Sequence, residues 1–183
     1  MQRLKSILKR FLFRQSDPLE ALKKKGLKVG RNFTMRENCI IDYSHCWHIE
    51  IGDDVTFAPR VHILAHDAST WQYLGYTKIK NVKIGSRVFI GSSSTIMPGV
   101  TIGDDVIIGS GSVVTKSIPS NSVVAGNPAR FIVNTDVYIA REKAKMTPGN
   151  CFGTDYSESE NVSEQKKGVI KQAAEKYGVS FAE

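Results

Sequence analysis

The sequence predicts an all-β solenoid, in which short parallel strands wind around one apolar core, and three observations support this fold class. Apolar residues recur every six positions, at Ile84, Ile90, Ile96, Ile102, Ile108 and Val114. A glycine follows several of them, at Gly85, Gly91, Gly103 and Gly109. The residue four positions after each marker is small or β-branched: Val88, Ser94, Val100, Val106, Ser112 and Ile118. Helices repeat every 3.6 residues and strands every two, so this period needs another geometry.

A triangular coil satisfies the period, because three six-residue units, each a flat strand plus a corner, return the chain to its starting side. A side chain then lies on the one three units later. This predicts that three pairs stack: Ile84 on Ile102, Ile90 on Ile108, and Ile96 on Val114. The alternative is a sandwich of ordinary strands, which would show a period of two and irregular turn spacing.

The same period begins earlier in the chain and is interrupted twice. Its earlier markers are Val29, Met35, Ile41, Ile51, Phe57 and Ile63. The spacing from Ile41 to Ile51 is too long for one unit, which predicts a bulge near His45 and Trp47. The spacing from Ile63 to Ile84 predicts a loop that leaves the coil between about Ala68 and Lys80, with the aromatic residues Trp71, Tyr73 and Tyr76. Long excursions from a regular scaffold are usually functional.

We expect three regions: a helical cap at residues 1–28, the coil at 29–130 and a C-terminal extension at 131–183. Residues 1–14 form a basic amphipathic pattern with apolar residues at Leu4, Ile7, Leu8, Phe11 and Leu12. A cap on the open end of the coil is favoured there, and membrane-surface contact is the alternative. Pro18 and Gly26 bracket a second short helix over residues 19–25. The extension reads as polar and flexible over residues 143–166, followed by a final helix that carries Val169, Ile170, Ala173, Ala174 and Tyr177.

Composition limits the function class. The chain has 183 residues, of which 41% are hydrophobic and 23% charged, as in a globular domain without a membrane-spanning run. Three cysteines without metal-like spacing, Cys39, Cys46 and Cys151, and the lack of a cleavable signal pattern predict a cytoplasmic protein. The net charge of +7 indicates an anionic partner. A phosphorylated cofactor is favoured over nucleic acid, because no nucleic-acid-binding motif is present.

Three segments resemble the hexapeptide-repeat acyltransferases, in particular the maltose and galactoside O-acetyltransferases and the sugar acetyltransferases of surface-polysaccharide synthesis. The segments are Val82-Lys83-Ile84-Gly85 through Ile102-Gly103, then Gly109 to Lys116, then Gly126-Asn127-Pro128-Ala129-Arg130. The resemblance covers roughly residues 26–130. It implies a left-handed parallel β-helix, a homotrimer and acetyl-CoA as the cosubstrate.

The resemblance also implies that His66, at the point where the long loop departs, is the general base. A sugar hydroxyl attacks a thioester poorly unless its proton is removed, a service worth roughly 10² to 10⁴ in rate. Histidine titrates near working pH and can take that proton. His62, His45 and His48 are rivals for this role. Asp67 is a weaker candidate to orient His66, because neighbouring residues of an extended segment point to opposite sides.

Two residues are candidates for binding the acceptor. The stretch Asn38-Cys39 followed by Ile41-Asp42 resembles a family segment whose asparagine contacts acceptor hydroxyls. We carry this role to Asn38 and to Asp42, whose ionised carboxylate accepts hydrogen bonds from a donor-rich sugar. The alternative for Asp42 is a turn residue that binds local backbone.

The cofactor candidates lie on the later coils. Small residues at Gly91, Ser93, Gly109 and Gly111 would let a pantetheine arm lie against the coil. Thr115 and Lys116 resemble family positions near the adenosine, and Arg130 could meet a phosphate of coenzyme A. The alternative for Lys116 and Arg130 is ordinary solvated surface. We expect no metal site.

The sequence therefore predicts an acetyl-CoA-dependent O-acetyltransferase that acts on a sugar or glycan precursor by direct transfer. An N-acetyltransferase on an amino nucleotide sugar is the near alternative. A gamma-type carbonic anhydrase also resembles the repeat, but it requires three metal-binding histidines, and the pair His62 with His66 is spaced differently from the pair of that family. A non-catalytic scaffold is the remaining alternative.

Overall fold

The computed structural model describes residues 18–156 and 162–183, so the basic helix predicted at residues 1–14 lies outside the described residues. The chain divides into two compact units between Thr135 and Asp136. The first unit contains the six-residue repeat and the second contains the C-terminal extension.

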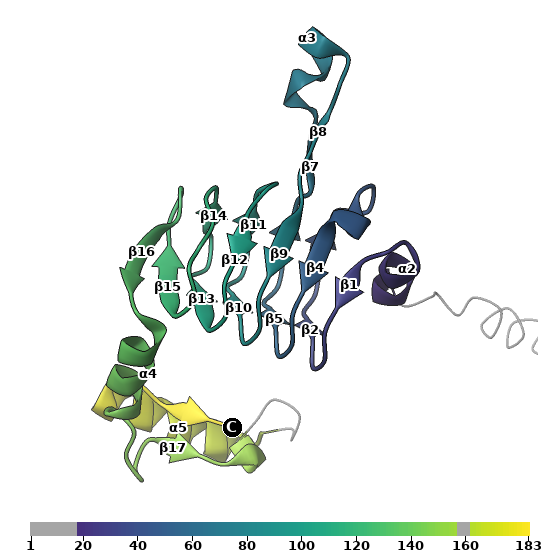
Figure 1. Cartoon of the computed structure of the whole chain (residues 1–183). Helices are drawn as coiled ribbons and strands as arrows, with labels where there is room; N and C mark the ends of the chain where they lie inside the picture. The colour runs from purple at the N-terminus through teal and green to yellow at the C-terminus, as the bar shows by residue number, and fades with distance from the viewer. Residues whose placement is uncertain (1–17, 157–161) are drawn as a thin grey trace, which may run out of the picture. The chain divides into compact units, whose positions relative to one another are not determined.

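The first unit is a three-sided coil of parallel strands (Figure 1). Sheet A consists of β1 (Lys28–Val29), β4 (Ile49–Ile51), β9 (Val82–Ile84) and β12 (Thr101–Ile102). Sheet B consists of β2 (Thr34–Met35), β5 (Thr56–Phe57), β10 (Phe89–Ile90), β13 (Val106–Ile108), β15 (Ser122–Ala125) and β16 (Arg130–Val133). Sheet C consists of β3 (Ile40–Ile41), β6 (His62–Ile63), β11 (Thr95–Ile96) and β14 (Val113–Val114). Taken in chain order from β1 to β14, these strands enter sheets A, B and C in turn, which gives the predicted triangular path. The last of these strands, β16, runs antiparallel to β15.

The strand register confirms the predicted stacking of apolar markers. Ile84 pairs with Ile102 on sheet A, Ile90 with Ile108 on sheet B, and Ile96 with Val114 on sheet C. The earlier markers continue the same columns, because Val29 pairs with Ile51 and Ile51 with Ile84. The six-residue period therefore specifies the register of the whole coil.

The small or β-branched residues four positions after the markers are also buried, as the sequence predicted. The apolar members, Val88, Val100, Val106 and Ile118, are at most 7% exposed. The two serines among them, Ser94 and Ser112, are fully buried, and the Ser94 hydroxyl forms hydrogen bonds with the backbone of the next coil. Ser94 Oγ donates to the Gly109 carbonyl at 3.1 Å and accepts from the Ser112 N–H at 3.3 Å. Serine thus fits a buried corner because each hydroxyl has a backbone partner.

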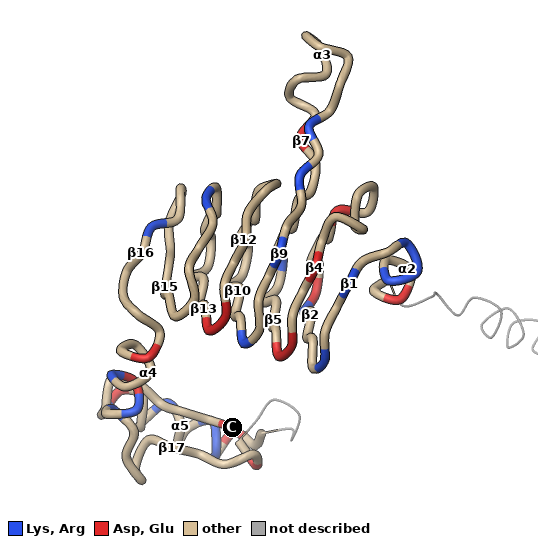
Figure 2. The backbone as a smooth tube through the Cα atoms, viewed as in Figure 1, with Lys and Arg blue, Asp and Glu red and all other residues tan. Residues whose placement is uncertain are grey.

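The corners of the coil follow a repeating backbone conformation. Residues with positive φ stack at the corner between sheets A and B: Asn32, Asp54, Arg87, Asp105 and Asn121. A second stack lies between sheets B and C: Asn38, Arg60, Ser93 and Gly111. Along the corner between sheets A and B, called the first corner, ion pairs link adjacent coils, for example Arg31 with Asp53 at 2.7 Å and Arg87 with Asp105 at 2.6 Å. These charges form an alternating row along one edge of the coil (Figure 2).

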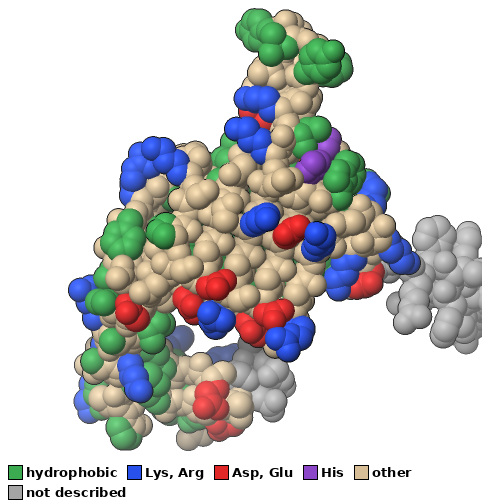
Figure 3. Space-filling model, viewed as in Figure 1, with side chains coloured by type: hydrophobic (Ala, Val, Ile, Leu, Met, Phe, Trp, Pro, Cys, Tyr) green, Lys and Arg blue, Asp and Glu red, His purple; other side chains and the backbone are tan. Residues whose placement is uncertain are grey.

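The third corner, between sheets C and A, contains both predicted interruptions. The bulge is a turn that includes the 3-10 helix η1 (Cys46–His48). The long loop is a hairpin that projects from the coil (Figure 1), with β7 (His66–Asp67) antiparallel to β8 (Lys78–Ile79). Between these strands lie η2 (Ala68–Thr70) and α3 (Trp71–Leu74). Hydrophobic side chains cover the end of the hairpin (Figure 3), and Tyr73 is 87% exposed.

The short helix predicted before the coil is α2 (Pro18–Lys24). Its Leu22 is 7% exposed and belongs to the same buried cluster as the coil markers, so α2 packs on the first coil. The chain leaves α2 through Gly26, which has a φ of +106°. Glycine adopts this conformation without the steric cost that a side chain would add.

The second unit is more ordered than the sequence predicted. It contains α4 (Thr135–Lys143), β17 (Cys151–Phe152), η3 (Thr154–Tyr156), α5 (Glu164–Tyr177) and β18 (Phe181–Ala182). Helix α5 confirms the predicted final helix. The expectation of a flexible stretch is wrong around Asn150, which is fully buried. Its side chain accepts from the Thr147 N–H at 2.7 Å and donates to the Lys145 carbonyl at 2.9 Å. These hydrogen bonds order a polar stretch that has few apolar side chains to bury.

None of the helices in the described part of the chain is both long enough and apolar enough to cross a bilayer.

Candidate active site

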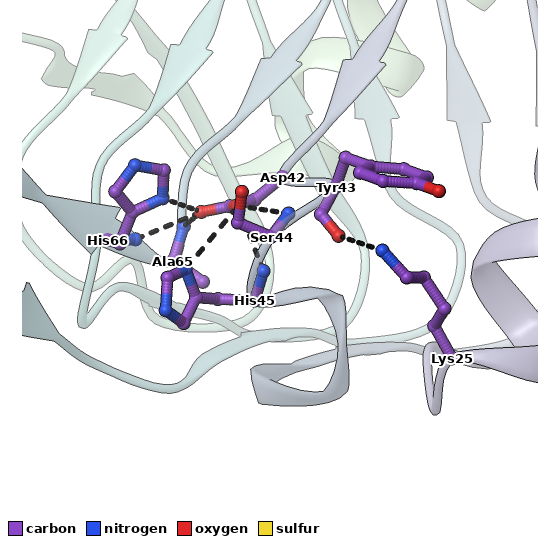
Figure 4. Close-up of polar contacts among 7 residues, drawn as sticks. All are labelled: Lys25, Asp42, Tyr43, Ser44, His45, Ala65 and His66. Atoms are coloured by element: carbon purple, nitrogen blue, oxygen red, sulfur yellow. Dashed lines mark hydrogen bonds and ion pairs between the residues drawn. The ribbon is translucent and has the colours of Figure 1, made fainter.

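Asp42 and His66 meet at the third corner, although 24 residues separate them in the chain. Asp42 directly follows β3, and His66 begins β7 shortly after β6 ends. Since Ile41 stacks on Ile63, the residues that follow these two strands leave the coil side by side. The register of sheet C therefore brings the two side chains together (Figure 4).

The Asp42 carboxylate is saturated by hydrogen bonds. Its Oδ2 accepts from the backbone N–H of Ala65 at 2.9 Å, from the N–H of His66 at 3.1 Å and from His66 Nδ1 at 2.5 Å. Its Oδ1 accepts from the N–H groups of Ser44 and His45, both at 3.1 Å. This carboxylate fixes the position of both the His66 ring and the turn that follows β3.

Burial and hydrogen bonding act in opposite directions on the pKa of Asp42. Its side chain is only 1% exposed, and this burial is the largest single influence and favours the neutral acid. The hydrogen bond from His66 and those from the backbone of Ala65 and His45 favour the carboxylate, and together they hold the pKa below its ordinary value. Asp42 is therefore an anion at neutral pH.

An ionised Asp42 determines which nitrogen of His66 carries the proton. The carboxylate can only accept, so Nδ1 of His66 must donate to it. The other ring nitrogen, Nε2, then has a free lone pair. The His66 side chain is 33% exposed, so a bound molecule can reach the ring. This arrangement suits a general base, because the carboxylate also stabilises the imidazolium that forms when Nε2 takes a proton.

The other three histidines lie in different settings. His62 is on β6, where it pairs with Ile40 and Thr95 along sheet C. His48 Nδ1 lies 2.7 Å from the Asn81 side-chain oxygen. The His45 ring is 4.9 Å from the His66 ring between centroids, and its Nδ1 is buried without a hydrogen-bond partner. Of these, His45 is the neighbour of His66 at the third corner.

The geometry bears on two of the sequence-based candidates. Asp42 was predicted to bind the acceptor, but its side chain is buried, and its oxygens accept hydrogen bonds from the local backbone, as in the alternative, and from the His66 ring. Asp67 was considered for the role of orienting His66, but its carboxylate binds Lys78 Nζ at 2.6 Å and accepts from the Ser69 N–H at 2.8 Å. Asn38 lies at the opposite end of β3 from Asp42, exposed at the second corner.

The predicted cofactor residues fall into two groups. Ser93 and Gly111 lie at the second corner, whereas Thr115 and Lys116 directly follow β14 at the third corner. Arg130 is exposed at the start of β16. These positions are spread over several coils of the first unit, as an extended molecule would require.

The glycines predicted to face the cofactor have a structural reason for their size. Gly91 is buried, and a Cβ there would lie 2.5 Å from the Ser110 nitrogen of the next coil. A Cβ on Gly109 would lie 2.8 Å from the Ala125 Cβ. Close approach of adjacent coils explains both glycines without a cofactor, so Gly91 and Gly109 give no separate support for a cofactor site.

A small cavity of about 180 Å³ lies beside the base of the hairpin. It is lined by Asp67, Lys78, Lys80, Met97, Pro98 and Thr115. Of these, only Thr115 was singled out from the sequence as a cofactor residue. The two lysines were missed because they belong to the loop, where sequence spacing does not indicate which coil they approach. The cavity joins the hairpin to the third corner of the later coils.

Asp42, His45 and His66 also lie close enough together to hold a metal ion, since each offers one donor atom within 4.8 Å of the others. The Asp42 oxygens already accept five hydrogen bonds, four of them from backbone N–H groups. A metal ion would have to displace these bonds. His62 is not part of the cluster, so the histidine pair that suggested a carbonic anhydrase does not form the centre of this site.

Comparison with known proteins agrees with this geometry. The family described as "Bacterial transferase hexapeptide (six repeats)" matches residues 81–116. The protein named CapG from Staphylococcus aureus is 36% identical over 162 residues, which cover 85% of this chain and 89% of CapG. The galactoside O-acetyltransferase of Escherichia coli K12 is 42% identical over 116 residues, and the match spans 58% of this chain and 53% of that protein.

Two solved structures share the fold. A galactoside acetyltransferase in complex with coenzyme A has a TM-score of 0.53 and 31% identity, over 77% of this chain and 82% of that one. A maltose O-acetyltransferase from Clostridium difficile 630 has a TM-score of 0.52 and 45% identity, over 58% of this chain and 57% of that one. With the CapG match extending over most of both chains, the protein belongs to the hexapeptide-repeat acyltransferase family.

Proposed function

We propose that this protein is an acetyl-CoA-dependent O-acetyltransferase that acts on a hydroxyl of a sugar or glycan precursor. The observation that carries the proposal is the pair formed by Asp42 and His66, which leaves Nε2 of a partly exposed histidine able to accept a proton. The names of several relatives support the acceptor class, since they are galactoside, maltose or lipopolysaccharide O-acetyltransferases.

The reaction is a direct transfer with one proton to move. The acceptor oxygen attacks the thioester carbonyl carbon while His66 Nε2 takes the hydroxyl proton. The tetrahedral intermediate then collapses with cleavage of the carbon–sulfur bond, and His66 returns the proton to the departing sulfur. The products are the acetyl ester and free coenzyme A. Asp42 keeps Nδ1 protonated throughout and stabilises the imidazolium between the two proton transfers.

The cosubstrate would approach along the third corner. The cavity beside the hairpin brings Lys78 and Lys80 close to Thr115, and Lys116 is the next residue of the same corner. Ammonium groups suit the phosphates of coenzyme A through charge-assisted hydrogen bonds. Ser93, Gly111 and Arg130 remain further candidates, and Asn38 remains the candidate for an acceptor hydroxyl. The solved galactoside acetyltransferase with coenzyme A supports this choice of cosubstrate.

Assembly and sense of winding also belong to the proposal. We infer a left-handed coil and a homotrimer with each active site between neighbouring subunits, both implied by the family resemblance. A cytoplasmic location would supply acetyl-CoA and keep the three free cysteines, Cys39, Cys46 and Cys151, reduced. Light scattering tests the trimer, and a stable active monomer would refute it.

The experiment that tests the function is a free-thiol assay with acetyl-CoA and a panel of methyl glycosides, amino sugars and nucleotide sugars. Thiol release that depends on a glycoside, with an acetyl ester identified by NMR, is the expected result. An acetamide product would move the assignment to the N-acetyltransferase alternative, because the same base can deprotonate an attacking amine. If none of these acceptors causes thiol release, both the O-acetyltransferase and the N-acetyltransferase assignments are contradicted.

A further inference from the structure

The turn from Tyr43 to His48 is an addition to the repeat that lies directly beside the proposed base. The Asp42 carboxylate that orients His66 also accepts the backbone N–H groups of Ser44 and His45 (Figure 4). Any movement of the turn would therefore disturb the same carboxylate. The turn and the base are therefore joined through one carboxylate.

A row of aromatic rings leads from the base along this turn. The centroid of the His45 ring is 4.9 Å from that of His66 and 5.5 Å from that of Trp47. The Trp47 ring is in turn 5.8 Å from that of His48. His45 thus separates the indole of Trp47 from the base by one ring.

The neighbouring residues hold Trp47 in place without covering it. Cys46 is fully buried, and its backbone neighbours are thereby fixed. Gly26 gives the tryptophan room, because a Cβ at that position would lie 2.9 Å from Trp47 Cβ. Yet the Trp47 side chain remains 50% exposed. An exposed indole whose backbone is held by its neighbours offers a flat apolar surface, and its side chain loses little conformational entropy when a ligand binds.

We propose that Trp47 binds the second sugar ring of the acceptor, next to the sugar that is acetylated. A sugar has faces of C–H groups and a rim of hydroxyls, so its face packs on an aromatic ring while its rim stays hydrated. The hydroxyl that reacts must lie at His66, and Trp47 lies one ring beyond the immediate neighbour of His66. The inference rests on the proposed function and assigns the acceptor to disaccharides or longer glycans.

The test compares acceptors of different length. Methyl glucoside, galactoside and N-acetylglucosaminide are each assayed beside the corresponding disaccharide, methyl maltoside, lactoside or chitobioside. The wild type should use the best disaccharide with a kcat/KM about tenfold above that of its monosaccharide, in line with one well-packed aromatic contact. Trp47→Ala should remove this preference and leave the monosaccharide kcat/KM within about twofold. Trp47→Phe, which keeps an aromatic face, should restore part of the preference.

Trp71 provides the control, because it is the second of the two tryptophans in the chain and is 57% exposed on the hairpin. Trp71→Phe should retain the length preference. This variant also leaves Trp47 as the single tryptophan, so its fluorescence should change on titration with the preferred disaccharide without acetyl-CoA. An unchanged preference in Trp47→Ala, or no preference in the wild type, would overturn the assignment while leaving the transferase function intact. No transfer to any glycoside would refute the proposed function itself.

Discussion

The Asp42 carboxylate and the His66 ring share a hydrogen bond of 2.5 Å across two turns that the coil stacks on each other. His66 contacts Asp42 twice, because its backbone N–H also donates to the same carboxylate. A histidine held at both its backbone and its ring cannot change tautomer without breaking this network. The catalytic hypothesis can therefore be tested separately for each member of the pair.

Replacing His66 by alanine should lower acetyl transfer by roughly two to four orders of magnitude, the usual contribution of a general base. The KM for acetyl-CoA should change little, because the cosubstrate contacts are assigned to other residues. The wild-type rate should rise as the pH passes through the range in which the base loses its proton, and this limb should vanish in the variant. Steady-state kinetics from pH 5 to 9 measures both effects.

His62→Ala is the matched control for that experiment. His62 lies on β6, four positions before His66, and pairs within sheet C. Its replacement should keep most of the activity and the rising pH limb. An inactive His62 variant beside an active His66 variant would show that the base has been assigned to the wrong histidine.

Asp42→Asn should slow transfer by about ten- to a thousandfold, because an amide cannot neutralise the imidazolium and can present a donor where His66 needs an acceptor. Asp53→Asn is its control, since Asp53 pairs with Arg31 at the corner between sheets A and B, away from the proposed base and cosubstrate cavity. Comparison of kcat for the two variants distinguishes an orienting carboxylate from a general effect of negative charge. Equal losses would argue against the role assigned to Asp42.

Acid should destabilise the fold partly through Asp42. The pKa of this carboxyl in the folded protein lies below its ordinary value of 3.8, so the unfolded chain binds protons first as the pH falls. The contribution to the free energy of unfolding is complete above that ordinary value and is lost as the pH drops through the folded pKa. The difference in Tm between wild type and Asp42→Asn should therefore shrink from pH 7 to pH 3. A difference that stays constant would contradict this linkage.

The contribution of the buried apolar markers to stability can be tested by comparing a buried and an exposed isoleucine of sheet C. Ile96→Ala should lower the free energy of unfolding by about 2–5 kcal/mol, because Ile96 is completely buried between coils. Ile40→Ala should cost about 0.5 kcal/mol or less, since Ile40 is 54% exposed on the same sheet. Urea denaturation measures both. A large loss at Ile40 would indicate that the proposed trimer covers this face.

The sequence predicted the coil well because its signal is a period. Each of the three stacked pairs, such as Ile84 with Ile102, follows from counting positions once three units close a turn. The same counting located the turn near His45 and the excursion after Ile63. Inward-facing positions are under a uniform packing constraint, which leaves a repeated mark on the sequence.

The site was only partly predictable because its parts come from the interruptions. The register of Ile41 on Ile63 places the turn and the hairpin side by side, but the contact of Asp42 with His66 also depends on how the two inserted segments leave the coil, which no spacing rule gives. Helix α4 was missed for a different reason. Its apolar residues Val137, Tyr138 and Ile139 are consecutive and exposed, so they do not form a helical stripe.

The two interruptions leave the columns of the coil unbroken. Ile41 still pairs with Ile63, and Ile51 with Ile84, on either side of the added residues. A corner can therefore gain or lose length without shifting any strand, as long as the chain returns to the column at which it left. Exchange of the hairpin segment at residues 68–77 should therefore leave the scaffold and its base in place, whereas exchange of residues 43–48 should also disturb Asp42, which accepts from the Ser44 and His45 N–H groups.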